Sequence, residues 1–177
     1  MHDDCGKLSG YDKLFFVIWT TTIWTLPGNL AIALHPDESY ALVKAPNGET
    51  YIMAEALVEK VMKVGGFESW EIAETHPGSF FENMLAQHPF LDKESLLCCA
   101  EYVTMDSGTG CVHTAPGFGA EDFQICQQYD KAGLTHIGVP VPVNAKGVMT
   151  DERYNGQFYA KGNDMVVEDL EKEGFLV

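Results

Sequence analysis

The stretch Gly108-Thr109-Gly110-Cys111-Val112-His113-Thr114-Ala115-Pro116-Gly117-Phe118-Gly119-Ala120-Glu121-Asp122 has a histidine and a carboxylate on either side of a glycine- and proline-rich loop. The residues before the loop predict a short strand that carries His113. Asp122 falls in the first turn of the helix expected after the loop, where the helix macrodipole favours a negative charge. We therefore expect Asp122 to be an anion at neutral pH, and an anion at a pocket wall is a natural partner for a ligand's ammonium group.

A second polar cluster lies upstream, in Trp19-Thr20-Thr21-Thr22-Ile23-Trp24-Thr25-Leu26-Pro27-Gly28-Asn29. The apolar run at residues 14–19 predicts a buried strand, and the proline and glycine that follow the threonines predict a bend. A bend after a buried strand exposes side chains at a rim. Hydroxyl groups there can orient a water molecule or a ribose, and Asn29 offers both a donor and an acceptor.

Each of these residues also has a structural interpretation. A run of threonines fits an ordinary pleated strand. A single histidine such as His113 is more often structural than catalytic, and Asp122 suits the start of any helix. The residues taken one by one leave both interpretations open.

Length and composition favour one globular domain. The chain has 177 residues, of which 46% are hydrophobic and 21% are charged, as is typical of a folded protein with a sizeable core. We expect a polar lead-in at residues 1–13 and a single domain at residues 14–177. The longest apolar run is too short to span a bilayer, and the first residues lack the pattern of a secretory signal. The sequence thus predicts a cytoplasmic protein without a membrane partner.

No cofactor, metal site or covalent nucleophile is expected. The five cysteines are odd in number and include no C-x-x-C pair, which argues against a disulfide framework and against zinc. The order Ser107, His113, Asp122 matches that of a hydrolase triad, but the G-x-S-x-G elbow is missing. The glycine-rich loops that bind ATP or NAD are missing as well.

The charge argues against strong nucleic-acid binding. The formal net charge is −15, with 10 lysines and one arginine, Arg153. Because phosphate groups are bound by Lys and Arg, we expect weak affinity for nucleic acids. Any such affinity must come from a local basic rim or from the rest of a larger protein.

Local patterns predict a mainly β protein with helices, of the α+β class. The turn Ala45-Pro46-Asn47-Gly48 predicts a hairpin between strands at 39–44 and 49–53. The spacing of apolar residues predicts a helix over 54–64 that ends at Gly65.

The second half of the chain continues this alternation. Further strands are expected at 68–75, 101–105 and 111–114, an extended edge segment at 139–143, and a turn at 144–147. A helix is expected over 121–132, with Phe123, Cys126 and Tyr129 facing inward and Gly133 after its end. A last helix is expected to be capped by Asn163 and closed by Gly174. Residues 77–89 are ambiguous.

The two polar clusters together resemble the editing domain of isoleucyl-tRNA synthetase. The matching motifs are Thr20-Thr21-Thr22-x-Trp24-Thr25-Leu26-Pro27-x-Asn29 and Gly108-Thr109-Gly110-x-Val112-His113-Thr114-Ala115-Pro116-Gly117-x-Gly119-x-x-Asp122. The resemblance runs from about residue 14 to residue 177. The segments Ala86-Gln87-His88-Pro89-Phe90 and Tyr159-x-x-x-Asn163 also resemble the bacterial form.

The resemblance implies a fold and an activity. The fold is a closed β-barrel with peripheral helices, inserted in a class I synthetase. The activity is hydrolysis of mischarged Val-tRNA(Ile), with valyl-adenylate as a further substrate, by a positioned water and without a covalent intermediate. The implied partners are the acceptor end of tRNA(Ile), the valyl group and the rest of the parent synthetase, which also holds the ATP-dependent ligase site.

The resemblance also assigns roles to residues. Asp122 would bind the α-ammonium group, and His113 would wall the side-chain pocket so that valine enters and isoleucine does not. Thr22 and Thr25 would act on the substrate and the attacking water. The substrate-binding group is completed by neighbouring residues of the first motif, namely Trp19, Thr20, Thr21, Trp24 and Asn29.

Two residues depart from the family pattern. Ile23 stands where the family usually has proline, which predicts a less rigid bend. Phe118 stands where bacterial members usually have histidine, which removes a polar group from the loop. One alternative function is therefore a catalytically weakened module that only binds the tRNA acceptor end; another is an unrelated β-rich protein. The segment His136-Ile137-Gly138 matches part of the synthetase nucleotide-binding tetrapeptide by chance, since Val139 replaces the second histidine.

Overall fold

The computed structural model describes residues 5–8, 10–132 and 138–177. Contacts divide the chain into two compact units. Unit 1 comprises Met1–Thr20, Ala31–Gln87 and Glu94–His113, and unit 2 comprises Thr21–Leu30, His88–Lys93 and Thr114–Val177. The interpretations placed on Gly133 and on residues 136–137 lie outside the described residues, as do residues 1–4 of the lead-in. The single domain over 14–177 stays a prediction.

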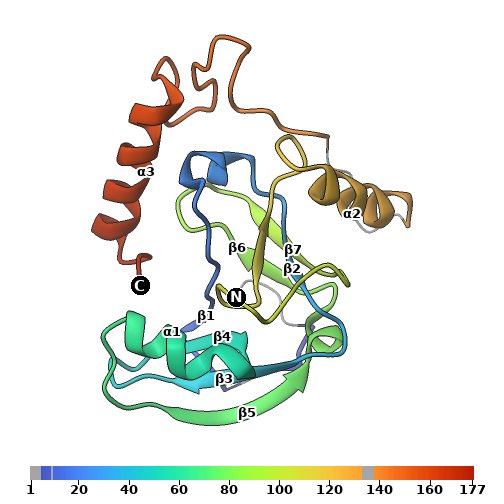
Figure 1. The fold of residues 1–177 in the computed structure, drawn as a ribbon, viewed down its shortest axis with the longest axis vertical. Coiled ribbons are helices and arrows are strands. Elements are labelled where there is room, and N and C mark those ends of the chain that lie inside the picture. The colour runs from blue at the N-terminus through green and yellow to red at the C-terminus, as the bar shows by residue number, and fades with distance from the viewer. Residues whose placement is uncertain (1–4, 9, 133–137) are drawn as a thin grey trace. The chain divides into compact units, whose positions relative to one another are not determined.

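Unit 1 contains two four-stranded sheets (Figure 1). The first has the order β1-β4-β3-β5, and the second has the order β6-β7-β2-β8. The first consists of β1 (Leu14–Phe16), β3 (Ser39–Lys44), β4 (Thr50–Ala54) and β5 (Glu71–Pro77); the second consists of β2 (Ala31–Leu34), β6 (Leu85–Gln87), β7 (Glu94–Cys99) and β8 (Val112–Thr114). The pairs β1–β4 and β2–β7 are parallel, whereas β3 pairs with β4 and β5, and β6 with β7, in antiparallel fashion.

The two sheets of unit 1 share one hydrophobic core. Leu42 and Ile52 of the first sheet meet Leu34 and Leu97 of the second, and all four side chains are fully buried. Phe81, from the short 3-10 helix η3 (Gly78–Phe81), lies in the same cluster. Burial of each such side chain stabilises the fold by about 1.5–3 kcal/mol.

The other face of the first sheet is covered by α1 (Val58–Val64), which follows the 3-10 turn η2 (Glu55–Leu57) (Figure 1). Met62 of α1 packs in one buried cluster with Val43 and Met53 of the sheet. Because both faces of β3 and β4 are covered, their central residues are apolar without alternation.

Unit 1 is of the mixed α+β class, as predicted. Trp19, in the segment that follows β1, forms a single parallel bridge with Val112 of β8, which is an edge strand of the second sheet. Among the described strands, β5 and β6 stay at the outer ends of their sheets. The strands described thus form two sheets, without the pairing that would close a barrel.

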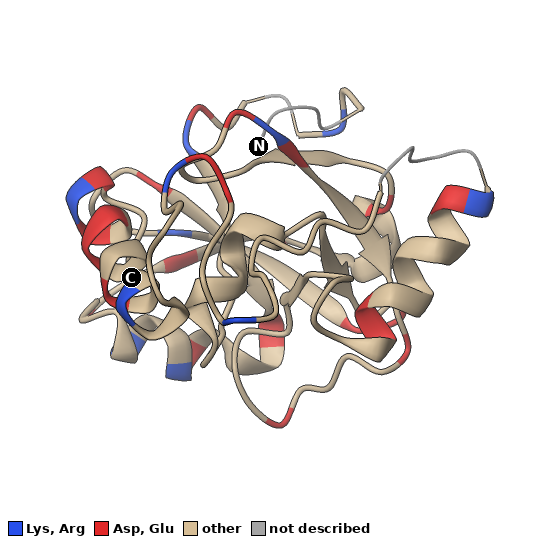
Figure 2. Cartoon of the chain, turned by 90° about the horizontal axis from the view of Figure 1, so that it is seen from above, with Lys and Arg blue, Asp and Glu red and all other residues tan. Residues whose placement is uncertain are grey.

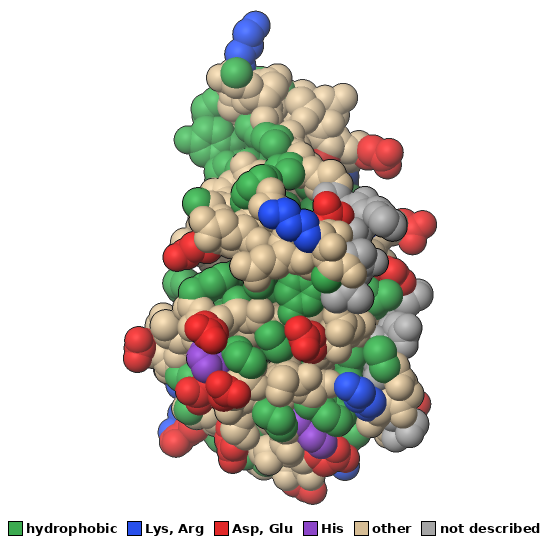
Figure 3. Space-filling view, turned by 90° about the vertical axis from the view of Figure 1, so that its right-hand side faces the viewer, with side chains coloured by type: hydrophobic (Ala, Val, Ile, Leu, Met, Phe, Trp, Pro, Cys, Tyr) green, Lys and Arg blue, Asp and Glu red, His purple; other side chains and the backbone are tan. Residues whose placement is uncertain are grey.

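Unit 2 contains the 3-10 helix η1 (Ile23–Gly28) and the helices α2 (Ala120–Lys131) and α3 (Tyr159–Glu173). Helix α3 packs against η1. A Cβ atom at Gly162 of α3 would lie 2.0 Å from the sulfur of Met149, so a larger residue there would displace the buried Met149 side chain. Hydrophobic side chains also reach the surface, as Figure 3 shows for one face; in unit 2, Val141 and Phe158 are each 52% exposed.

Several predictions of local structure are confirmed. The hairpin pairs β3 with β4 from Lys44 and Thr50 outward, and Gly48 donates its N–H to the carbonyl of Ala45. The helix predicted over 54–64 is present, with its first turn in 3-10 form. The turn at 144–147 is closed by the Gly147 N–H on the Asn144 carbonyl, at 2.9 Å. The final helix ends at Gly174, whose φ of 78° is left-handed.

Other predictions of strands are wrong. The strand expected at 14–19 ends at Phe16, and only Leu14 in it is buried, because β1 is an edge strand. Residues 101–105 form turns and bends, and the true strand, β7, precedes them. The sequence pattern does not indicate β2, whose four residues are all buried and so show no alternation of polar and apolar side chains. The strand expected at 68–75 is β5, which begins and ends a few residues later.

Two predictions about helices are also wrong. Of the three residues expected to face inward in α2, Tyr129 is buried and Cys126 half-buried, whereas Phe123 is 41% exposed; Ile125 is the other buried residue. Asn163 lies inside α3 and does not cap it, since the helix already begins at Tyr159.

The lead-in is not merely solvated. Leu8 is buried in the core of unit 1, and the Lys7 ammonium donates to the Phe80 carbonyl at 2.8 Å.

Candidate active site

The threonine segment forms the predicted bend. Thr22, with φ −125° and ψ 63°, precedes η1. Both the backbone N–H and the hydroxyl of Thr25 donate to the Thr22 carbonyl, at 3.1 and 2.7 Å. Since Thr25 is only 5% exposed and its hydroxyl hydrogen is used within the turn, this residue holds the bend. Thr21 is exposed and Thr22 half-buried, which leaves those two side chains better placed to meet a ligand.

Trp24 is held between two aromatic rings of unit 2. Its ring centroid is 5.1 Å from that of Phe118 in an edge-on arrangement and 5.2 Å from that of Tyr159. Phe118 therefore has a packing role at a position where bacterial members of the resembled family usually have histidine. Such aromatic pairs add about 0.5–1.5 kcal/mol beyond the burial of their area.

The end of η1 is held by the segment 88–93. The buried His88 has its Nε2 atom 3.0 Å from the Leu26 carbonyl oxygen. The Lys93 ammonium donates to the carbonyl oxygens of Pro27, at 2.6 Å, and Asn29, at 2.8 Å. Asn29 itself is buried, at 4% exposed. No feature of the sequence singled out Lys93, because lysines normally extend into solvent.

Asp122 lies in the first turn of α2, as predicted. Its Oδ2 atom accepts the backbone N–H of Ala115 at 2.8 Å, so the carboxylate ties the loop to the helix. A Cβ atom at Gly119 would lie 2.8 Å from the Asp122 carboxyl carbon, which explains the glycine before this helix.

The electrostatics of Asp122 combine two opposing effects. Burial raises the pKa of this carboxyl above its ordinary value, and the Ala115 N–H acts in the opposite direction. The macrodipole alone suggested a shift toward the anion; the net direction is upward because desolvation is the larger effect.

Within unit 2 the two signature segments meet. The Leu30 N–H donates to the Thr114 carbonyl at 3.0 Å, and a Cβ atom at Gly28 would lie 2.9 Å from the Phe118 ring. Together with the contact of Trp24 with Phe118, these contacts place residues 21–30 beside residues 114–122. The structure thereby brings the threonine bend and the loop of Asp122 into one compact body.

The remaining candidate residues, Trp19, Thr20 and His113, lie in unit 1. The parallel bridge pairs Trp19 with Val112, so Thr20 and His113 are the next residues along the two paired segments. Trp19 is 58% exposed. A Cβ atom at Gly108 would be 3.4 Å from the Trp19 Cβ, which shows that the two signature segments run side by side in unit 1 as well.

The part of the chain that the structure describes has one exposed cysteine, Cys5, and four that are buried or half-buried. No group of three or more metal-ligating side chains is found in that part of the chain. Burial raises the pKa of the Cys111 thiol, which donates to the Ile52 carbonyl. No helix among the described residues is long and apolar enough to cross a membrane.

Comparison with known proteins agrees with this arrangement. Residues 7–171 match the family described as "Leucyl-tRNA synthetase, editing domain". The crystal structure of GlLeuRS-CP1 has a TM-score of 0.76, with 16% identity over 93% of this chain and 83% of that chain. The editing domain of the P. knowlesi cytosolic leucyl-tRNA synthetase has a TM-score of 0.71, with 13% identity over 90% of this chain and 82% of that chain.

Relatives of higher identity are bacterial isoleucine–tRNA ligases. That of Kosmotoga olearia is 50% identical over 92% of this chain and 17% of its own length. That of Geobacillus thermodenitrificans is 46% identical over 99% of this chain and 18% of its own length. The chain thus spans about a fifth of the length of the curated relatives it matches.

The fold and the paired segments define a domain of the editing type found in class I aminoacyl-tRNA synthetases, and the chain belongs to that family. Its higher-identity relatives are isoleucine–tRNA ligases, so the resemblance to isoleucyl-tRNA synthetase drawn from the two motifs is confirmed.

Proposed function

We propose that this chain hydrolyses the ester bond of Val-tRNA(Ile) and, as a further substrate, valyl-adenylate. A synthetic site for isoleucine cannot strongly exclude valine, because one missing methylene is worth only about 1–3 kcal/mol, a range for which isoleucyl-tRNA synthetase itself is a standard example. A second site that admits only the smaller side chain corrects this by hydrolysis. The membership in the editing family supports the proposal.

The position of Asp122 carries the proposal. Its carboxylate sits in the first turn of α2, where the Ala115 N–H fixes it, and belongs to the same compact unit as Thr21, Thr22 and Thr25. A fixed, half-buried carboxylate is a specific partner for the α-ammonium group of an aminoacyl ester. Binding that group there would orient the ester carbonyl toward the threonine bend.

Water is the proposed nucleophile. An aminoacyl ester is already activated, so that positioning and charge complementarity suffice without a covalent intermediate. Thr21 and Thr22 are proposed to contact the substrate and the water, and Thr25 to keep the bend in shape. By the family resemblance, His113 limits the size of the side-chain pocket, while Trp19, Thr20, Trp24 and Asn29 complete the substrate-binding group.

The proposal extends to the partners and the fold. The acceptor end of tRNA(Ile) and the rest of a parent synthetase are the proposed partners, with ligation of isoleucine carried out elsewhere in that parent. A closed barrel and a cytoplasmic location remain predictions.

The test is Asp122→Ala in the full-length protein that carries this segment, assayed by deacylation of Val-tRNA(Ile). Loss of an ammonium clamp should lower the deacylation rate by about 10²-fold or more, since one charge-assisted contact to a reacting group is worth several kcal/mol. The matched control is Asp130→Ala, an exposed carboxylate on the same helix, which should leave the rate unchanged. Unchanged hydrolysis by Asp122→Ala would contradict the role of Asp122 in binding the α-ammonium group. An inactive wild-type protein would favour the alternative function, a module that only binds the tRNA acceptor end.

A further inference from the structure

A lysine lies at the end of the threonine turn and is turned inward. Lys93 is half-buried, and its ammonium donates to the carbonyl oxygens of Pro27 and Asn29, at 2.6 and 2.8 Å. These carbonyls end the 3-10 helix η1, where backbone acceptors lack partners within the helix. A cation there also complements the negative end of the helix dipole. Lys93 therefore supplies the hydrogen-bond donors and the positive charge that this end of η1 lacks.

His88, in the same loop as Lys93, also contacts the end of η1. The Nδ1 atom of His88 accepts the backbone N–H groups of Phe90 and Leu91, at 3.4 and 3.2 Å. Since Nδ1 is an acceptor, Nε2 carries the proton and donates to the Leu26 carbonyl at 3.0 Å. The segment 88–93 thus contacts the end of η1 at three carbonyl groups.

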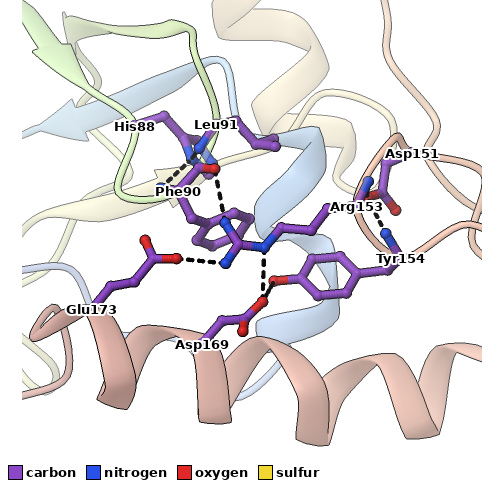
Figure 4. A network of polar contacts seen from close by, with 8 residues as sticks. All are labelled: His88, Phe90, Leu91, Asp151, Arg153, Tyr154, Asp169 and Glu173. Carbon is purple, nitrogen blue, oxygen red and sulfur yellow. Dashed lines mark hydrogen bonds and ion pairs between the residues drawn. The ribbon is translucent and has the colours of Figure 1, made fainter.

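The segment 88–93 is itself fixed. The His88 N–H donates to the Lys93 carbonyl at 2.9 Å and closes the loop. Arg153 donates to the Phe90 carbonyl at 3.0 Å and also binds Asp169 and Glu173 of α3 (Figure 4). The loop that carries Lys93 is therefore held to helix α3 through Arg153.

The burial of Lys93 is energetically unfavourable in itself. Desolvation lowers the pKa of its ammonium to about 8, while the negative charge of Asp151 opposes this shift. The Oδ2 atom of Asp151 is buried without a hydrogen-bond partner among the described residues. The two carbonyl contacts of the ammonium offset part of this desolvation cost, since a buried charge is tolerated only where it is hydrogen-bonded.

We propose that Lys93 is a positioning residue for editing, which holds the threonine turn in its active shape through the carbonyls of Pro27 and Asn29. This inference rests on the proposed function for its catalytic consequence, but its structural part stands on the contacts alone. Lys93 touches no reacting atom. It acts through the turn that presents Thr21 and Thr22.

The experiment compares Lys93→Met with Lys93→Arg in the complete chain. Methionine fills a similar volume without donors, whereas arginine keeps the charge and the donors. The control is Lys131→Met, because Lys131 is exposed and bonds only Gln127 on its own helix among the contacts described. Amide hydrogen exchange by NMR is measured at Thr25 and Asn29, whose N–H groups bond within the turn, and at Gly65 after α1 as an internal reference.

We expect Lys93→Met to exchange about tenfold faster at Thr25 and Asn29, with Gly65 unchanged, because loss of two hydrogen bonds lowers the local opening energy. Lys93→Arg should restore most of the protection, and Lys131→Met should match the wild type. Unaltered exchange in Lys93→Met would overturn the positioning role, whatever the activity.

Deacylation separates the two proposals. In Lys93→Met we expect kcat on Val-tRNA(Ile) to fall about tenfold with little change in KM, since the turn contributes mainly to the transition state. The preference for Val-tRNA(Ile) over Ile-tRNA(Ile) should also decrease, which a uniform loss of folded protein would not produce. An inactive wild type with faster exchange in Lys93→Met contradicts the proposed function alone, and an unchanged kcat in an active protein contradicts the inference alone.

Discussion

Asp122 shows how burial and hydrogen bonding compete at one carboxylate. Removal from water raises its pKa, and the N–H of Ala115 limits the increase. The free-energy cost of desolvating the carboxylate is offset when a cation binds in place of the lost water. The upward direction reflects burial, and a bound ammonium group would lower the pKa of Asp122 again.

The pH dependence of deacylation follows from this shift. Binding of the ammonium group requires the ionised carboxylate, which predominates above the pKa of Asp122. Burial raises that pKa above its ordinary value. We expect kcat/KM for Val-tRNA(Ile) to fall as the pH is lowered, with an apparent pKa above the value of about 3.9 for an ordinary aspartate. The measurement is a pH profile of the wild type beside Asp122→Asn, in which this acid limb should vanish. A limb at or below the ordinary value would argue against a desolvated carboxylate.

The sequence could indicate Asp122 and the threonines but not the residues that support them. Helix position and loop composition are local and can be read from neighbouring residues. Lys93 is distant in sequence from Pro27 and Asn29, and its burial results from tertiary packing. The hydrogen bond of Thr25 to the Thr22 carbonyl likewise depends on tertiary burial, which neighbouring residues do not indicate.

At the scale of elements, the loop of Asp122 and the turn η1 are joined by close packing. Gly28 approaches the ring of Phe118 so closely that a Cβ would lie 2.9 Å from it, and Trp24 packs edge-on against the same ring. Phe118 thus replaces a polar residue of the family pattern with an aromatic contact. The turn forms although Ile23 stands in the usual place of proline.

Gly28→Ala should therefore lower the free energy of unfolding by about 1–3 kcal/mol, because the added methyl group overpacks the contact with Phe118. Phe118→Leu in the same chain should relieve part of this cost, with a coupling energy of about 0.5–3 kcal/mol. Both are measured by urea unfolding. Gly138→Ala is the control, since no atom lies within 4 Å of its added Cβ. Simple additivity of the two substitutions would mean that the segments do not touch in solution.

Elements with strong local signals were predictable, and elements set by packing were not. The turn between β3 and β4 contains proline, asparagine and glycine. This turn indicates both the hairpin and the pairing of the two strands. The strands β2 and β7 pair in parallel through distant residues, and no turn marks their partnership. The helical pattern of α2 wrongly predicts an inward Phe123, because periodicity alone does not show which stripe of the helix the rest of unit 2 covers.

At the scale of the whole molecule, charge limits what the chain can hold. Acidic residues number 26 and basic residues 11. Along the ribbon in Figure 2 the basic residues form short separate segments and no continuous stretch. Affinity for a polyanion depends on the number of phosphates that Lys and Arg neutralise, so the 11 basic residues against 26 acidic ones favour weak binding by this chain alone.

We therefore expect the chain alone to bind tRNA with a Kd weaker than about 10 μM at physiological salt, as in non-specific binding. The logarithm of the affinity should change little with that of the salt concentration, because few counterions are released. A fluorescence titration at several salt concentrations measures both quantities. Submicromolar binding with a steep salt dependence would reveal a basic surface that the charge count conceals.

The most direct measurement is a crystal structure of the chain with a non-hydrolysable valyl-adenosine analogue. The account predicts that the α-ammonium group of the analogue lies within about 3 Å of an Asp122 carboxylate oxygen, with the ester position facing Thr21 and Thr22. An analogue bound elsewhere, or bound here with its amine directed away from Asp122, would contradict it.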